Sequence, residues 1–181
     1  LGPVSMAKLI TPYKGVCPRI HPEAYVDISA RIIGNVEIKE GVSIWPMAVL
    51  RADSAAICVE RRSAVLDLAL LEAPEGHPVL VGSEVLISHG AVIHGAQIRS
   101  QALVGIGAIL LDGSVVSSGT IVGAGSVVSP GTRLPPNVLV MGTPARIIRE
   151  TTEEERRNIL AQLNGLYAKS RDYPVPSPDP G

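Results

Sequence analysis

Aromatic residues are almost absent from this sequence of 181 residues. They make up only 3% of the chain, with no phenylalanine and a single tryptophan, although 46% of the residues are hydrophobic. Most of the apolar side chains are therefore Val, Ile, Leu and Ala. A wide core built around aromatic rings is excluded, and we expect a narrow and regular interior.

Cysteines, long apolar runs and net charge are also scarce. Cys17 and Cys58 form no Cys-x-x-Cys pair and are too few for a disulfide framework, which favours a reducing compartment. No run of about 18 apolar residues and no leader-like segment is visible, so we predict neither a membrane span nor a signal peptide. The net charge of -1 would attract neither nucleic acid nor an anionic membrane. We expect a cytoplasmic protein without these partners.

An internal repeat of six residues runs through most of the chain. Aliphatic residues recur in phase, with one restart after residue 50, a break over residues 73–78 and one five-residue step after residue 93. The positions are Val26, Ile32, Ile38, Ile44, Leu50, Val59, Val65, Leu71, Val81, Ile87, Ile93, Ile98, Val104, Leu110, Val116, Val122, Val128 and Leu134. The residue two places earlier is usually small or β-branched. So long a run in phase is not chance.

A period of six excludes an amphipathic helix, whose period is 3.6, and does not fit simple alternation. It requires short strands joined by regular turns, with one hexapeptide on each face of a triangular coil. Coils must stack, because one repeat cannot bury its apolar side alone. We therefore predict an all-β protein with a parallel β-helix over residues 21–150, rather than a β-sandwich. Glycines are expected to supply the turn conformations, at Gly34, Gly82, Gly105, Gly107, Gly113, Gly119, Gly125 and Gly131.

A single α-helix is predicted after the repeats. Thr152 and Glu155 fit a capping box. The apolar stripe that follows consists of Ile159, Leu160, Leu163, Leu166 and Tyr167. We therefore predict an α-helix over residues 151–170, packed on the outside of the β-helix.

The two ends of the chain are predicted to lie outside the fold. Residues 1–5, LGPVS before Met6, look like a remnant of an expression vector, and residues 6–20 lead into the β-helix. Residues 171–181 include PVPSPDPG and are predicted to be a flexible, Pro-rich tail.

Two of the four histidines lie close together in the repeats. His89 and His94 occur in ISHGAVIHG, among small and aliphatic residues that let another surface approach. Neutral imidazole is the commonest metal ligand, so this pair is a candidate metal site. The other interpretation is that both are surface histidines without a role. Because the faces of a regular prism are flat, any site is expected between prisms, and we predict an oligomer.

Several longer segments carry a family resemblance. The segments SIWPMAVLRAD, SHGAVIHG, VGIGAILLDG, VGAGSVV and MGTPARIIRETTEEE resemble the γ-class carbonic anhydrase family over nearly the whole chain from Tyr13 to Tyr167. Their order and spacing are specific, whereas hexapeptides alone are shared with many acyltransferases. The resemblance implies a left-handed β-helix that forms a homotrimer. It also implies reversible hydration of carbon dioxide to bicarbonate at a metal held by three histidines from two neighbouring subunits.

The resemblance assigns roles to particular residues. His89 and His94 fall on two metal ligands, and Arg51 and Asp53 on a pair near the subunit interface. Asp67 matches a retained family aspartate, and Tyr167 resembles a family tyrosine near the site, although its place in the apolar stripe favours packing. Arg51 could steer bicarbonate. We favour a salt bridge to Asp53 of a neighbouring subunit, because a buried charge needs a partner.

The sequence departs from the family at the third ligand. Glu72 stands where the family has a histidine, Leu66 where it has a glutamine beside the metal-bound water, and Ala64 where it has an asparagine. Glu72, His89 and His94 could still hold zinc or another divalent first-row metal such as iron or cobalt. A carboxylate lowers the Lewis acidity of the metal, and the missing glutamine removes an orienting hydrogen bond, so hydration should be weak or lost.

Other hypotheses remain. If Glu72 faces solvent, the chain is an inactive trimeric scaffold or assembly protein, and His77 in the same loop could supply a substitute imidazole. A hexapeptide acyltransferase or thioesterase is disfavoured, because no segment resembles a coenzyme A pocket.

Overall fold

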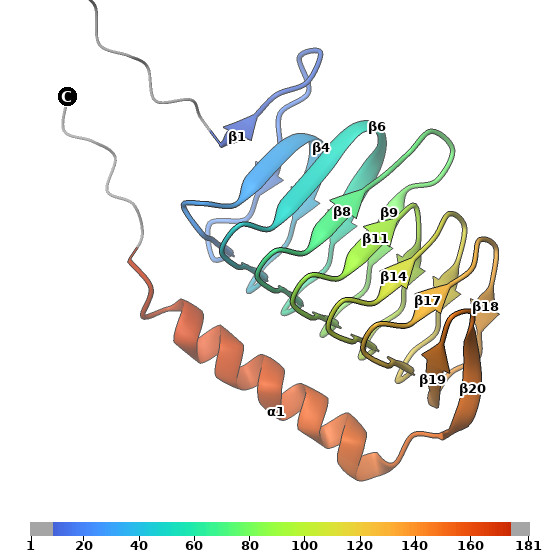
Figure 1. Cartoon of the computed structure of the whole chain (residues 1–181). Helices are drawn as coiled ribbons and strands as arrows, with labels where there is room; N and C mark the ends of the chain where they lie inside the picture. Colours follow the sequence, from blue (N-terminus) through green and yellow to red (C-terminus); the bar gives the residue numbers. More distant parts are fainter. Residues whose placement is uncertain (1–8, 175–181) are drawn as a thin grey trace, which may run out of the picture.

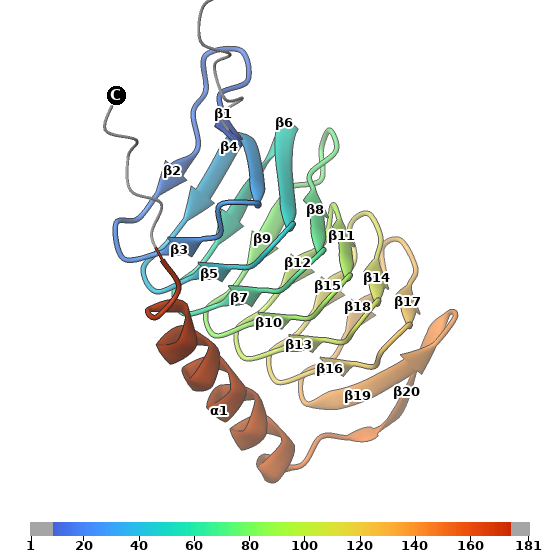
Figure 2. The ribbon, with the colours of Figure 1, turned by 60° about the vertical axis from the view of Figure 1, so that its left-hand side comes forward.

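The chain folds into a left-handed parallel β-helix of about seven turns, followed by one α-helix (Figure 1). This computed structural model describes residues 9–174, so the predicted vector remnant and most of the predicted tail lie outside the described residues. Each turn crosses three faces, which the ribbon shows as parallel rungs (Figure 2). The predicted fold class is confirmed.

The strands are short and stack in register. The first face contains β3 (Tyr25–Val26), β5 (Ser43–Ile44), β7 (Ala64–Val65), β10 (Leu86–Ile87), β13 (Leu103–Val104), β16 (Ile121–Val122) and β19 (Val138–Gly142). The second face contains the first halves of β4 (Arg31–Ile38) and β6 (Val49–Val59), then β8 (Leu70–Glu72), β11 (Val92–His94), β14 (Ile109–Leu110) and β17 (Val127–Val128). The third face contains β2 (Arg19–Ile20), the second halves of β4 and β6, β9 (Val79–Val81), β12 (Gln97–Ile98), β15 (Val115–Val116) and β18 (Arg133–Leu134). At the two ends, β1 (Ile10–Thr11) pairs with β4, and β20 (Ala145–Glu150) pairs antiparallel with β19.

The aliphatic residues of the repeat fill the interior. On the second face, Ile32, Leu50, Leu71, Ile93 and Leu110 are consecutive partners across the strands, and all are 0% exposed. Each such side chain contributes about 1.5–3 kcal/mol by leaving water. The predicted phase of the hexapeptides is therefore confirmed.

Glycines serve the turns in two ways. A left-handed turn conformation, with φ between +65° and +71°, occurs as predicted at Gly107, Gly113, Gly119, Gly125 and Gly131. The same prediction is wrong for Gly82 and Gly105, whose φ is not positive. A Cβ on Gly105 would lie 2.7 Å from the carbonyl oxygen of Val122, so glycine is required there because the next coil approaches closely.

Gly34 combines both constraints and supplies a stability prediction. Its φ is +79°, and a Cβ would overlap the carbonyl oxygen of Ala52 on the adjacent strand. We expect Gly34→Ala to lower the free energy of unfolding by about 3–4 kcal/mol, combining left-handed strain with overpacking. Gly131→Ala is the control, because its φ is +69° but nothing lies within 4 Å of its Cβ. That variant should lose only about 1 kcal/mol. Equal losses in urea unfolding would show that overlap with Ala52 does not matter.

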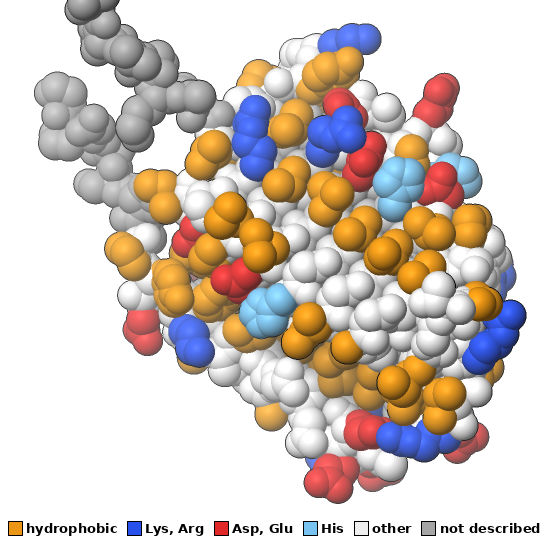
Figure 3. All heavy atoms as spheres, viewed as in Figure 1, with side chains coloured by type: hydrophobic (Ala, Val, Ile, Leu, Met, Phe, Trp, Pro, Cys, Tyr) orange, Lys and Arg blue, Asp and Glu red, His pale blue; other side chains and the backbone are white. Residues whose placement is uncertain are grey.

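The outer surfaces of the three faces differ. On the second face, the outward column begins at Arg31 and continues with half-buried apolar side chains, namely Val49, Leu70, Val92, Ile109 and Val127. The equivalent column on the third face is mixed, with Arg19, Glu37, Cys58, Leu80, Gln97, Val115 and Arg133. The space-filling view looks onto the second face and shows apolar side chains running between histidines at its two margins (Figure 3).

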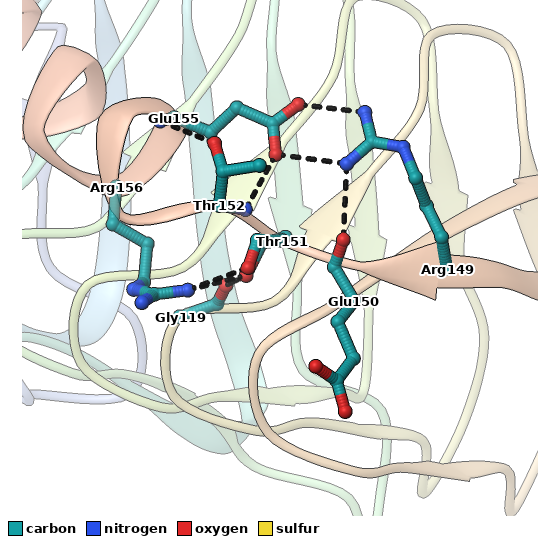
Figure 4. Close-up of polar contacts among 7 residues, drawn as sticks. All are labelled: Gly119, Arg149, Glu150, Thr151, Thr152, Glu155 and Arg156. Carbon is teal, nitrogen blue, oxygen red and sulfur yellow. Dashed lines mark hydrogen bonds and ion pairs between the residues drawn. The ribbon is translucent and has the colours of Figure 1, made fainter.

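The first face is covered by helix α1 (Glu153–Ser170). The predicted capping box is confirmed, because Thr152 accepts from the backbone of Glu155 and the Glu155 carboxylate accepts from the backbone of Thr152 (Figure 4). Arg149 donates two further hydrogen bonds to Glu155 and lowers the pKa of this carboxyl to about 2. Ile159 and Leu163 are buried against the first face as predicted. In the described part of the chain, no helix has the length and apolar character needed to cross a bilayer.

Candidate functional site

The His89 edge consists of the turns that join the first face to the second. Four apolar side chains on this edge are 58–63% exposed, namely Ile28, Met47, Leu68 and Ile106. Backbone hydrogen bonds stack the turns, including one of 2.9 Å from the Gly107 N–H to the carbonyl of His89. Exposed aliphatic side chains flanking a histidine are unusual on a surface that faces only water. This edge therefore has the character of a contact surface.

His89 is oriented by a carboxylate. Its Nδ1 lies 3.2 Å from Oδ1 of Asp67, and its side chain is 53% exposed. A carboxylate accepts but cannot donate when ionised, so this contact favours the proton on Nδ1 and leaves the Nε2 lone pair free.

The His94 edge consists of the turns that join the second face to the third. Here β6, β8 and β11 place Arg51, Glu72 and His94 opposite one another in one row. Nη2 of Arg51 lies 2.7 Å from Oε1 of Glu72, and Nε2 of His94 lies 3.7 Å from Oε2. The Glu72 side chain is 24% exposed, so it is partly shielded by this row and does not lie free in solvent.

Asp112 lies next to His94, at the end of the row opposite Arg51. It was not singled out from the sequence. Nδ1 of His94 contacts Oδ1 of Asp112 in the next coil. Each ring nitrogen of His94 therefore faces a carboxylate, with Nδ1 toward Asp112 and Nε2 toward Glu72. Counting along the repeat does not pair these two residues, because Ile93 has Leu110 as its partner, 17 residues further on, whereas Asp112 follows His94 by 18 residues.

The residues that could bind a divalent metal form two separate groups, one on the His89 edge and one on the His94 edge. His94 Nε2 and Glu72 Oε2 are two atoms of metal-binding type that lie 3.7 Å apart, somewhat wider than two adjacent ligands of zinc. His89 and His94 are at opposite ends of the second face, one before β11 and the other its last residue. Among residues 9–174 of a single chain, no three His, Cys, Asp or Glu side chains could hold a metal ion. A site with three such ligands would therefore need a donor from outside the described part of this chain.

Arg51 pairs with Asp53 within one chain, at 2.9 Å between Nη1 and Oδ2. This hydrogen bond, with the nearby charge of Glu72, raises the pKa of Arg51 further above its ordinary value. The sequence favoured a bridge between two subunits. This contact within one chain forms because Asp53 lies two residues further along the same strand, on the same side as Arg51, and a bridge to a neighbouring subunit stays a prediction.

Three other residues singled out from the sequence do not join the row. Leu66 is 6% exposed and packs with Trp45 beneath helix α1. Tyr167 lies at the end of that helix, with the guanidinium of Arg62 3.6 Å from its ring. His77 is exposed, with its ring near Gly113 on the His94 edge.

Known proteins resemble this chain over most of its length. A carbonic anhydrase from Geobacillus kaustophilus is 38% identical over 91% of this chain and 90% of its own. The mitochondrial gamma carbonic anhydrase 1 of Arabidopsis thaliana is 38% identical over 76% of this chain and 52% of its own. A crystal structure of a hexapeptide transferase family protein from Anaplasma phagocytophilum superposes with a TM-score of 0.89 at 32% identity, covering 93% of this chain and all of that one. No family model matches the chain. Together with the hexapeptide fold and the paired histidines, these likenesses mean that the chain belongs to the γ-carbonic anhydrase-like family of hexapeptide-repeat proteins.

Proposed function

We propose that this chain forms a homotrimer that binds a divalent first-row metal at each subunit interface and hydrates carbon dioxide slowly. His94 and Glu72 of one copy and His89 of its neighbour would hold the metal, with zinc, iron or cobalt as candidates. The observation that carries the proposal is the orientation of both histidines. Each directs Nδ1 to a carboxylate, Asp67 or Asp112, and so keeps Nε2 available, which is the usual arrangement around a metal-binding imidazole.

The surface of the second face supports the trimer. The first face is covered by α1 and the third carries charged side chains, whereas the second presents its apolar column and the exposed residues of the His89 edge. In a cyclic trimer each interface is heterologous, so one edge of a subunit meets a different edge of its neighbour. The His89 edge of one copy would then meet the His94 edge of the next, and the two half-sites would face each other.

Each residue of the proposed site has a different role. The chemistry that a bound zinc ion would supply is Lewis acidity, which lowers the pKa of water toward neutrality. Asp67 and Asp112 hold the imidazoles in their ligating tautomer. Glu72 brings a negative charge in place of a neutral imidazole, which opposes that Lewis acidity. Leu66 is buried under α1, away from the row of Glu72 and His94, so the charge of Glu72 is the reason to expect slow hydration.

Metal content and mixed trimers test this proposal. Protein grown with zinc should contain about one metal per chain, and His89→Ala and His94→Ala should each contain almost none. Trimers assembled from both variants should regain metal at about a quarter of their interfaces, where an intact His94 edge meets an intact His89 edge. A trimer with less than about 0.1 metal per native chain would instead support a scaffold protein. Mixed trimers without metal would refute the shared site.

The likeness to a hexapeptide transferase family protein keeps acyl transfer as a second candidate, which binding of coenzyme A in calorimetry would favour. A cytoplasmic location stays a prediction from the two cysteines, both free thiols in the structure.

A further inference from the structure

Glu72 contacts a different neighbour with each carboxylate oxygen. Oε1 accepts from Nη2 of Arg51 at 2.7 Å, and Oε2 faces Nε2 of His94 at 3.7 Å. The strand order is β6, β8, β11, so Arg51 and His94 lie on opposite sides of Glu72. The guanidinium therefore approaches Glu72 from the side opposite His94.

Arg51 is itself held in place. Asp53 accepts a hydrogen bond of 2.9 Å from Nη1, so the two terminal nitrogens of the guanidinium are bound to two different carboxylates. A planar guanidinium fixed at two points restricts the rotamers of the glutamate that it contacts. Its charge also offsets the negative charge of Glu72, a position at which the family has a neutral imidazole.

We propose that Arg51 is a positioning residue that aims Oε2 of Glu72 at the metal position and offsets part of the carboxylate's added charge. This inference rests on the proposed function, because it assigns a role at the same site. It explains how a glutamate can replace a histidine ligand here. A glutamate without such a partner would lose side-chain freedom on binding and bring an uncompensated charge.

The test is the zinc affinity of the full-length trimer, measured by competition with a chromophoric chelator. We expect Arg51→Met to weaken zinc binding about 10–100-fold, the usual effect of losing a residue that orients a ligand. Arg51→Lys should recover part of the loss, because it keeps the charge but not the two-point geometry. Arg19→Met is the control, since Arg19 pairs with Glu37 on the third face and should leave the affinity unchanged.

A second background separates positioning from a general effect on the fold. In Glu72→His, Arg51→Met should not weaken zinc binding, because no carboxylate remains to be aimed. The visible spectrum of the cobalt-loaded trimer should change on Arg51→Met in the native background and not in Glu72→His. Sedimentation of each variant verifies that the trimer is intact.

The possible outcomes separate the two proposals. Native affinity or tighter binding in Arg51→Met would overturn the positioning role, and tighter binding would mean that the guanidinium competes with the metal. An equal loss in the Glu72→His background would also overturn it. A native trimer that binds no zinc would instead overturn the proposed function, and this inference with it.

Discussion

The Glu72→His variant is expected to hydrate carbon dioxide at least about tenfold faster than the native chain. Histidine at this position restores three neutral ligands, so the ligand set no longer opposes the Lewis acidity of the metal. The change should be tolerated, because Glu72 is at the end of β8 with its side chain pointing outward and partly exposed. Arg51 keeps Asp53 as a partner, so no buried charge is left alone. Stopped-flow measurement of hydration, with metal content determined in parallel, checks the prediction.

Glu75→His is the matched control for this gain. Glu75 is exposed in the same loop but lies outside the row formed by Arg51, Glu72 and His94. It adds an imidazole and removes a carboxylate without altering the proposed ligand set, and its rate should stay at the native level. If Glu72→His bound metal fully and showed no gain in rate, the carboxylate ligand would not be what limits hydration. We would not add Leu66→Gln, because an amide there would be buried beneath α1.

Val92→Glu is expected to abolish the trimer. Val92 is in the middle of the apolar column on the second face, and its side chain points away from the core. The monomer should fold, because the new carboxylate can reach water when the face is uncovered. In the trimer each interface would bury an unpaired charge, at a cost of about 3–5 kcal/mol. Analytical ultracentrifugation should show monomers, and metal content should fall together with the trimer.

Leu80→Glu distinguishes this effect from a general loss of apolar surface. Leu80 points outward from β9 on the third face and is 39% exposed. Its replacement should leave both the trimer and the metal content unchanged. Dissociation by Leu80→Glu and not by Val92→Glu would place the interface on the third face. The proposed facing of the His89 and His94 edges would then be wrong.

The fold could be predicted from the sequence because each coil repeats the same pattern of short strands and turns. An aliphatic residue at every sixth position has to point inward, and Thr152 with Glu155 marks the start of the helix. The apolar or mixed character of the outer surfaces was less visible. It depends on the side chains next to the aliphatic position, such as Val92 beside Ile93, and these become a column only when the coils are stacked.

The candidate site was only partly predictable. His89, His94 and Glu72 could be named from the family pattern, whereas the contact of Arg51 with Glu72 could not. These two residues are on adjacent strands, but the chain between them is longer than three hexapeptides, because β6 contains extra residues between Ala52 and Ile57. Simple counting therefore puts them out of register. The position of Leu66 was missed for a similar reason, since it depends on which face the C-terminal helix covers.

The antiparallel β20 at the end of the first face has a consequence for the behaviour of the protein at high concentration. A β-helix that simply stopped would present unpaired backbone groups, which invite another molecule to continue the sheet. Here the last strand of the first face is β20, whose exposed side chains include Arg146, Arg149 and Glu150. The other sheet ends on β17 and β18, which are only two residues long each. A second prism at this end would meet the charged side chains of β20 and only short strands on the other two faces, which disfavours growth into fibres there.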